Sequence, residues 1–177
     1  MNNHKALSKV KKILIIGSGG AGKSTFARQL HRITGLPLIH LDQKYWQPNW
    51  EMPDRLEWTE QVKDLVQQEA WIMDGNYSST LDIRLAAADL VIFLDRPTYL
   101  CFYRVLKRTW RNHGRTRSDM TRDCPDRFDL EFLHYVLMYN WVRRPTILEK
   151  LEAWKEKVAV RRLKSDREVE AFLEGMK

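Results

Sequence analysis

The sequence predicts an α/β fold, with a parallel sheet covered by helices on both faces. Short apolar runs bounded by turn signals alternate with amphipathic helical patterns. The five runs have the length and the branched or aromatic content of buried strands, and they cover residues 13–16, 37–41, 71–74, 90–94 and 158–163. Such alternation is typical of parallel sheets whose crossover helices pack on both faces. Since 177 residues most simply form one domain, we assign residues 1–177 to a single unit.

The helical segments carry start and stop signals at the expected places. Phe26, Leu30 and Ile33 are spaced for one helix face, and Gly35 follows as a stop signal. Asp54 with Glu57 three residues later is a capping-box arrangement ahead of another apolar stripe. Further signals are an N-cap at Thr98, a break or kink at Pro145 and a capped final helix starting within 165–168.

The composition is that of an ordinary globular chain. It is 44% hydrophobic and 30% charged, without a low-complexity tract or an internal repeat. No apolar run approaches the ~20 residues that span a bilayer, and the run at 13–16 is too short for a signal peptide. Cys101 and Cys124 are too few for a disulfide framework and lack metal-ligand spacing. We therefore expect a cytoplasmic protein without a membrane partner.

A glycine-rich segment after the first predicted strand gives the most specific signal. Residues 17–24 read GSGGAGKS, which matches the P-loop pattern G-x-x-x-x-G-K-[ST] between a strand and a helix. Backbone N–H groups of such a loop surround phosphate oxygens, assisted by the positive end of the helix. In this pattern Lys23 reaches the β- and γ-phosphates, and the Ser24 hydroxyl ligates Mg²⁺. The segment predicts a site for a nucleoside triphosphate, most simply ATP, formed by Gly17, Ser18, Gly19, Gly20, Ala21, Gly22, Lys23, Ser24 and Thr25.

An acidic residue at the end of a neighbouring strand is expected to complete the Mg²⁺ site. Asp74 and Asp95 both end predicted strands. Asp95 fits the pattern of an apolar run followed by Asp slightly better, but Gly75 after Asp74 allows a substrate to approach the backbone closely. We favour Asp74 as the magnesium residue and expect the other aspartate to order nearby loops.

Residues 40–50, which read HLDQKYWQPNW, place a carboxylate and three aromatics directly after the second predicted strand. The carboxyl ends of parallel strands are where open α/β sheets bind ligands. We expect Asp42 to orient an acceptor hydroxyl or take its proton, with Tyr45, Trp46 and Trp50 as a flat wall beside it. The alternatives are an N-cap or ion-pair role for Asp42, and tryptophans that only pin the next helix to the sheet.

The interval from residue 104 to 127 is rich in arginine. It contains eight lysines and arginines and three aspartates, so its net charge is eight minus three, or +5, in 24 residues. A polar insertion of this length in a compact domain is typical of a functional loop, and we assign a lid to residues of about 108–128. Arg115 and Arg117 are the expected catalytic arginines, and Arg104 and Arg108 the expected nucleotide contacts. The alternative is a solvated basic surface.

Together these motifs resemble the adenylate-kinase-like P-loop kinases. Within that lineage, HLDQKYWQPNW, WIMDGNY, GRTRSDM and DRFDLEFLHYV are similar to the bacterial DNA topology modulation protein group, and the likeness runs from about residue 12 to 173. It implies a five-stranded parallel sheet in order 2-3-1-4-5 and the use of Mg-ATP. It also implies an acceptor-binding segment after strand two, at about residues 42–70, and a mobile arginine lid after strand four. Gly75, Asn76 and Tyr77 are the substrate contacts expected from the third strand.

One position departs from the adenylate-kinase pattern. Where those kinases have an arginine that holds the acceptor's phosphate, this chain has Ser78. Unless Arg84 turns into the site, few cations remain for a phosphate-bearing acceptor, which favours an uncharged hydroxyl.

The sequence therefore predicts an ATP- and Mg²⁺-dependent phosphotransferase that acts on a small molecule: a nucleoside, a nucleotide or another hydroxylated metabolite. Two alternatives stay open. One is a nucleotide-dependent regulator linked to DNA topology, whose arginines grip nucleic-acid phosphates, although the chain has no recognisable DNA-reading motif. The other is a plain ATPase. The oligomeric state does not follow from these residues.

Overall fold

The computed structural model describes residues 10–176, so the basic N-terminal stretch that precedes the first apolar run lies largely outside the described residues. Its elements are β1 (Lys12–Gly17), α2 (Lys23–Thr34), β2 (Leu38–His40), α3 (Leu41–Tyr45), η1 (Pro48–Trp50), α4 (Arg55–Gln67), β3 (Trp71–Asp74), η2 (Ser78–Thr80), α5 (Leu81–Ala87), β4 (Leu90–Leu94), α6 (Thr98–Asn112), α7 (Leu130–Val142), α8 (Arg144–Trp154), β5 (Ala159–Leu163) and α9 (Asp166–Glu174).

The five strands form one parallel sheet in the order β2-β3-β1-β4-β5, which confirms the predicted topology. The central strand β1 pairs with β3 on one side and β4 on the other. Its residues 13 to 16 are all buried, because in a sheet covered on both faces neither face meets water.

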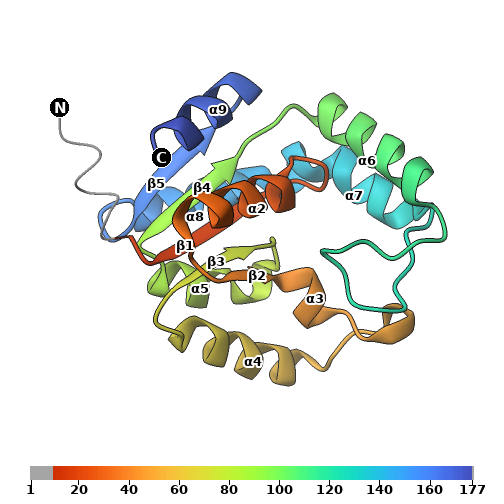
Figure 1. The fold of residues 1–177 in the computed structure, drawn as a ribbon, viewed down its shortest axis with the longest axis horizontal. Coiled ribbons are helices and arrows are strands. Elements are labelled where there is room, and N and C mark those ends of the chain that lie inside the picture. The colour runs from red at the N-terminus through yellow and green to blue at the C-terminus, as the bar shows by residue number, and fades with distance from the viewer. Residues whose placement is uncertain (1–9, 177) are drawn as a thin grey trace.

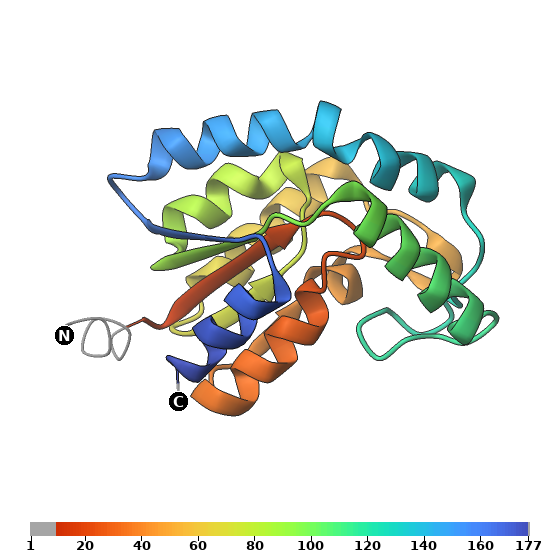
Figure 2. The same ribbon diagram turned by 90° about the horizontal axis from the view of Figure 1, so that it is seen from above.

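Alternate residues of β1 point into two separate cores. Leu14 and Ile16 pack with side chains of α4, α5 and α8, whereas Ile13 and Ile15 pack with those of α2, α6 and α9. Figure 2 shows the resulting layers, with the sheet between α8 on one face and α2 with α9 on the other. The predicted covering of both faces is therefore confirmed.

Most predicted helix boundaries match the structure. Gly35 ends α2 in the left-handed conformation, and the Asp54 side chain caps α4 by accepting from the Leu56 N–H at 2.7 Å. Ser165 caps α9, and α7 gives way to α8 directly before Pro145. The expected cap at Thr98 is wrong by one residue: Pro97 is the N-cap of α6, and no side chain bonds that helix start.

The sheet brings five loops to its carboxyl edge. The glycine-rich loop follows β1, α3 follows β2, residues 75–77 follow β3, residues 95–97 follow β4, and residues 164–165 follow β5. The long connection 113–129 between α6 and α7 lies beside the α3–η1 segment in Figure 1. Residues 108–112, which we expected to open the lid, form the last turn of α6. Between residues 10 and 176, no helix has both the length and the apolar character needed to span a membrane.

Candidate active site

The glycine-rich loop folds around the Lys23 ammonium. Lys23 Nζ donates to the carbonyl oxygens of Gly17 at 2.8 Å and Ser18 at 3.0 Å. Burial lowers the pKa of Lys23, and the negative charges of Asp42 and Asp74 oppose that shift. The ammonium therefore lies within reach of two of the predicted carboxylates, at the start of α2.

Gly20 shows why the loop needs glycine. Its φ is +78°, and a Cβ there would lie 2.3 Å from the carbonyl oxygen of Cys101 in α6. The loop backbone thus lies directly against the first turns of α6, leaving no space for any side chain at this position.

Asp74 lies at the end of β3 with only 4% of its surface exposed. Its Oδ1 is 2.5 Å from Nδ1 of His40, the residue it faces across β2 and β3. Burial opposes the charged form of His40, but the hydrogen bond and charge of Asp74 outweigh it and raise the pKa of the imidazole. His40 is therefore the partner that fixes this carboxylate.

Asp95, the other magnesium candidate, is committed elsewhere. Arg144 Nε donates to its Oδ1 at 2.8 Å, and Arg162 Nε donates to its Oδ2 at 2.6 Å. Burial raises the pKa of Asp95, but the two guanidinium groups outweigh it and hold that pKa below its usual range. Both oxygens of Asp95 thus join α8 and β5 to the end of β4.

Asp42 lies in the first turn of α3, and its Oδ1 accepts a hydrogen bond from the Tyr77 hydroxyl at 2.7 Å. Burial raises the pKa of Asp42, against the Tyr77 bond and the Lys23 charge, which favour the ionised form. The pKa of Tyr77 is also raised, by burial and by the neighbouring carboxylate. The structure thus joins the segments after β2 and β3 through one carboxylate.

The aromatic side chains around Asp42 pack mainly against one another. Tyr45 has ring-centroid distances of 4.6 Å to Tyr77 and 5.0 Å to Trp58, and Trp46 lies 5.3 Å from Trp50. Trp58, a buried residue of α4, had no place in the predicted site. Tyr45 therefore packs edge-on against both Trp58 and Trp46, and Trp46 in turn packs edge-on against the half-buried Trp50.

The connection 113–129 is docked on the acceptor segment. Thr121 Oγ1 donates to the carbonyl of Trp46 at 2.6 Å, the Cys124 thiol donates to that of Gln47 at 3.2 Å, and the Asn49 N–H donates to that of Asp123 at 3.1 Å. The two segments lie side by side in Figure 1. The connection 113–129 is therefore held against the α3–η1 segment by hydrogen bonds.

Acidic residues of the lid hold the predicted catalytic arginine. Arg117 Nη1 donates to Asp119 at 3.0 Å, and its Nε lies 3.2 Å from Asp126. Arg108 lies 3.6 Å from the same Asp126 carboxylate. Burial opposes ionisation of Asp119, but Arg117 and a hydrogen bond with the Ser24 hydroxyl outweigh it and lower its pKa. By sequence alone, Asp119 and Asp126 count only as charges that offset the arginines.

The other lid arginine is placed differently. Arg115 is exposed, and within residues 10–176 its guanidinium forms no ion pair. The structure thus brings Arg108 and Arg117 toward the glycine-rich loop, whereas Arg115 faces solvent.

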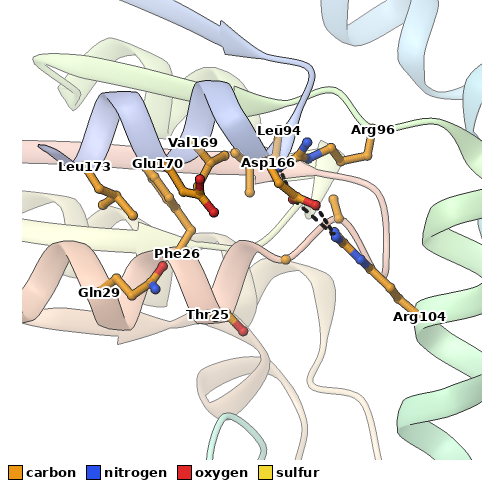
Figure 3. A pocket seen from close by; sticks show the side chains of 12 residues that line it. Thr25, Phe26, Gln29, Leu94, Arg96, Arg104, Asp166, Val169, Glu170 and Leu173 are labelled. Atoms are coloured by element: carbon orange, nitrogen blue, oxygen red, sulfur yellow. Dashed lines mark hydrogen bonds and ion pairs between the residues drawn. The ribbon is translucent and has the colours of Figure 1, made fainter. Parts of the chain in front are cut away.

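A cavity of about 310 Å³ adjoins the loop on its α2 side, among α2, α6 and α9. Figure 3 shows Arg104 extending from α6 to Asp166 at the start of α9. Arg104 donates to the Asp166 carboxylate at 2.9 Å, and Arg96 donates to the same carboxylate at 2.7 Å. Phe26 and Leu173 supply apolar walls. This mixture of apolar walls and a few fixed polar groups suits a flat heterocyclic ring. Arg104 was predicted to contact a nucleotide, whereas Asp166 was not singled out.

Asn76 has a bridging position. Its Oδ1 accepts from the Gly17 N–H at 3.0 Å, and its Nδ2 donates to the Tyr135 hydroxyl at 2.9 Å. We expected a substrate contact at Asn76, but in the structure its side chain ties the glycine-rich loop to α7.

The donor set for a cation is small. Among residues 10–176, no group of three His, Cys, Asp or Glu side chains is arranged to hold a metal. Mg²⁺ bound with a nucleotide needs fewer protein ligands, because phosphate oxygens and water fill the rest of its octahedron. The Ser24 hydroxyl and the Asp74 carboxylate, whose Oδ2 has no hydrogen bond within residues 10–176, fit that requirement.

Comparison with known proteins finds solved structures that share this fold, among them two shikimate kinases. The chain is similar to shikimate kinase from Acinetobacter baumannii in complex with shikimate, at 16% identity and a TM-score of 0.57, covering 97% of this chain and 93% of that one. It is also similar to shikimate kinase from Bacteroides thetaiotaomicron, at 13% identity and a TM-score of 0.51, covering 93% and 95%. No family model and no curated protein matches the chain. At these identities the likeness establishes the fold alone, and membership of the DNA topology modulation group stays a prediction.

Proposed function

We propose that this chain is an ATP- and Mg²⁺-dependent phosphotransferase that moves the γ-phosphoryl group of ATP to a hydroxyl of a small molecule. The observation that carries this proposal is the placement of Asp42. Its carboxylate lies beside the Lys23 loop, at the carboxyl edge of the sheet, under a lid docked on its own segment. Phosphoryl transfer requires such positioning and charge neutralisation more than covalent chemistry.

Residues 17–25 would bind the triphosphate, and the cavity beside Arg104 and Asp166 would receive the base. To reach the phosphates, Lys23 exchanges the carbonyls of Gly17 and Ser18 for phosphate oxygens. Ser24 and Asp74 would hold Mg²⁺, which neutralises charge on the β- and γ-phosphates when bound.

In the transfer step the acceptor oxygen forms a bond to the γ-phosphorus while the bond to the bridging oxygen of ADP breaks. Asp42 takes the acceptor's proton, and burial, which raises its pKa, makes it a better base than an exposed aspartate. Arg117 and Arg108 would stabilise the charge on the transferred group once nucleotide draws them from Asp119 and Asp126. The docked lid excludes water, which limits hydrolysis.

The acceptor we propose is an uncharged hydroxyl compound. Arg84, the expected substitute for the arginine missing at Ser78, is fully buried and donates to backbone carbonyls. Arg55 and Lys63 are exposed, and Lys63 pairs with Glu60. The segment 42–70 thus offers no inward cation for a phosphate on the acceptor.

The nucleic-acid regulator is the weaker candidate because Arg108 and Arg117 are paired with Asp119 and Asp126 and the chain has no recognisable DNA-reading motif, whereas Arg115 stays exposed. A plain ATPase accounts for the glycine-rich loop but not for a lid docked over Asp42.

An ADP-release assay over a panel of acceptors tests the proposal. The panel holds nucleosides, nucleoside monophosphates and hydroxylated metabolites, with shikimate included because a structural neighbour binds it. At least one uncharged hydroxyl compound should raise ADP release above the rate with water. Lys23→Ala should abolish the gain, while Lys157→Ala, an exposed control away from the site, retains it. If no acceptor exceeds water, the phosphotransferase assignment is wrong.

A further inference from the structure

Arg84 is a buried cation with an unusual set of partners. Its side chain in α5 is fully inaccessible to solvent. The guanidinium donates to the carbonyls of Gly75 at 2.9 Å, Asn76 at 2.5 Å, Tyr77 at 2.8 Å and Thr80 at 3.3 Å, and within residues 10–176 it pairs with no carboxylate. Burial lowers the pKa of Arg84 to about 9. Since burying an unpaired charge is costly, this arginine needs an explanation beyond ordinary packing.

The backbone that Arg84 binds is strained. Tyr77 has φ +30° and ψ +73°, in the left-handed region that residues with a side chain seldom adopt. Such a conformation persists only where the surroundings impose it, and it is concentrated at functional sites. The guanidinium binds the carbonyls of Tyr77 and of the two residues before it, which holds the chain in this shape.

The side chain of Tyr77 is fixed as well. Its ring lies 4.6 Å from that of Tyr45 and 5.1 Å from that of Trp58, measured between centroids. Its hydroxyl donates to Oδ1 of Asp42 at 2.7 Å. Because the ring is held on two sides and the backbone by Arg84, the direction of this hydrogen bond is set by the fold.

We propose that Arg84 and Tyr77 are positioning residues for the proton acceptor Asp42. Arg84 holds residues 75–77, and the Tyr77 hydroxyl fixes the orientation of the Asp42 carboxylate through Oδ1, which leaves Oδ2 for the acceptor hydroxyl. This role rests on the proposed function, because it takes Asp42 as the group that receives the acceptor's proton.

The hydroxyl also acts on the charge of Asp42. A hydrogen bond donated to a carboxylate favours the ionised form, in opposition to burial. The other charged or titratable groups around Asp42 are Lys23 of α2, Asp74 of β3, Arg108 of α6, Arg117 of the lid and Tyr135 of α7. Tyr77→Phe leaves all of these unchanged, so it isolates the contribution of one hydroxyl.

The first test is independent of activity. In ¹³C NMR titrations of the side-chain carboxyl carbons, the Asp42 signal is assigned by its absence in Asp42→Asn. Tyr77→Phe should raise the pKa of Asp42 by roughly one unit, the size expected for one lost charge-assisted hydrogen bond. Tyr139→Phe is the matched control, because it also removes a buried phenol hydroxyl, but one that has no hydrogen-bond partner within residues 10–176. An Asp42 pKa that is the same in wild type and Tyr77→Phe overturns the inference.

The second test uses Mg-ATP turnover with water, the acceptor present in every assay. Because a higher pKa leaves Asp42 protonated at a higher pH, the acid limb of the rate profile should move up by about one pH unit in Tyr77→Phe. KM for ATP should stay within about twofold, since the residue acts on the proton acceptor and not on the nucleotide. Tyr77→Phe should add no further loss in an Asp42→Asn background, whereas additive losses would mean that Tyr77 acts elsewhere.

Arg84→Lys extends the test to the backbone clamp. Lysine keeps the charge but has a single nitrogen, which cannot bond three successive carbonyls in the arginine geometry. It should shift the Asp42 titration in the same direction as Tyr77→Phe. If Arg84→Lys does not fold, Tyr77→Phe alone decides the proposal. Failure of the acceptor panel with an intact Tyr77 effect on Asp42 would reject the phosphotransferase function and leave the positioning contact in place.

Discussion

The glycine-rich loop and the acceptor segment lie at the same edge of the sheet, but they are built differently. Residues 17–25 present backbone groups, and their positions follow from close approaches such as that of Gly20 to Cys101. The acceptor side is formed by contacts between side chains. Tyr45 packs on Tyr77, the Tyr77 hydroxyl donates to Asp42, and Arg117 pairs with an aspartate of the lid.

This difference explains why one region is encoded by a short motif and the other is not. A backbone cradle depends on conformations that few residues adopt, so its sequence is constrained position by position. A side-chain site depends on partners contributed by α3, residues 75–77, α5 and the lid, which are distant in sequence. A substitution in the loop should therefore disrupt the loop itself and have a large effect on stability or nucleotide binding. A substitution on the acceptor side should act by changing the residues that contact the substituted side chain.

The largest effect is expected at Gly20. Gly20→Ala places a Cβ against the Cys101 carbonyl at a positive φ, so it should cost more than about 3 kcal/mol of unfolding free energy and abolish ATP binding. Gly114→Ala is the control, because it has a similar φ of +71° but open space around it, and should cost only about 1 kcal/mol. Urea denaturation and nucleotide titration measure both. Equal costs at the two glycines would contradict the close approach.

The next effect is expected at Asp42. Asp42→Asn retains the size of the side chain but cannot take a proton, so the transfer rate should fall roughly 100-fold with little change in KM for ATP. Glu149→Gln, an exposed change in α8, should leave the transfer rate unchanged. Steady-state rates with an acceptor from the panel measure this. If Asp42→Asn transfers phosphate as fast as wild type, Asp42 is not the proton acceptor, even where the phosphotransferase activity itself is found.

A smaller effect is expected at Asp95. Its pKa is lower in the folded chain than the unfolded value of about 3.9, so its contribution is present above that pH and is lost as the pH falls through the folded pKa. Asp95→Asn should cost about 2 kcal/mol at pH 7, because Arg144 and Arg162 lose their partner, and almost nothing well below pH 3. Urea unfolding at several pH values checks this, with the exposed Glu149→Gln as control. If the difference in unfolding free energy between wild type and Asp95→Asn does not change with pH, the charge of Asp95 is not its cause.

The smallest effect is expected in the lid. Thr121→Val removes hydroxyl bonds to the carbonyls of Gln43 and Trp46, which should weaken lid docking by about 1 kcal/mol. Hydrogen exchange of amides in 113–129 should then be about fivefold faster, while exchange in the glycine-rich loop stays the same. Thr116→Val is the control, since this exposed lid threonine has no hydrogen bond within residues 10–176. Equal exchange in both variants would mean that these bonds do not hold the lid.

Much of the fold was predictable because local signals and periodicity agreed. The five apolar runs became the five strands, and Asp54 and Ser165 cap the helices that their spacing predicted. The N-cap of α6 is Pro97 and not the predicted Thr98, and no side-chain hydrogen bond marks this helix start. The strand order came from the family resemblance and not from the strand sequences themselves.

The site divides in the same way. The sequence by itself determined the glycine-rich loop, the carboxylates at the ends of β2 and β3, and an arginine-rich lid, because each depends on residue types at fixed local spacing. Only the tertiary structure decided that Asp95 binds two arginines, that Asn76 joins the loop to α7, and that Arg84 holds the segment after β3. The physical reason is that a buried charge pairs with whichever groups the packed chain brings within hydrogen-bond distance. For Asp95 these groups belong to residues 49 and 67 positions further along the sequence.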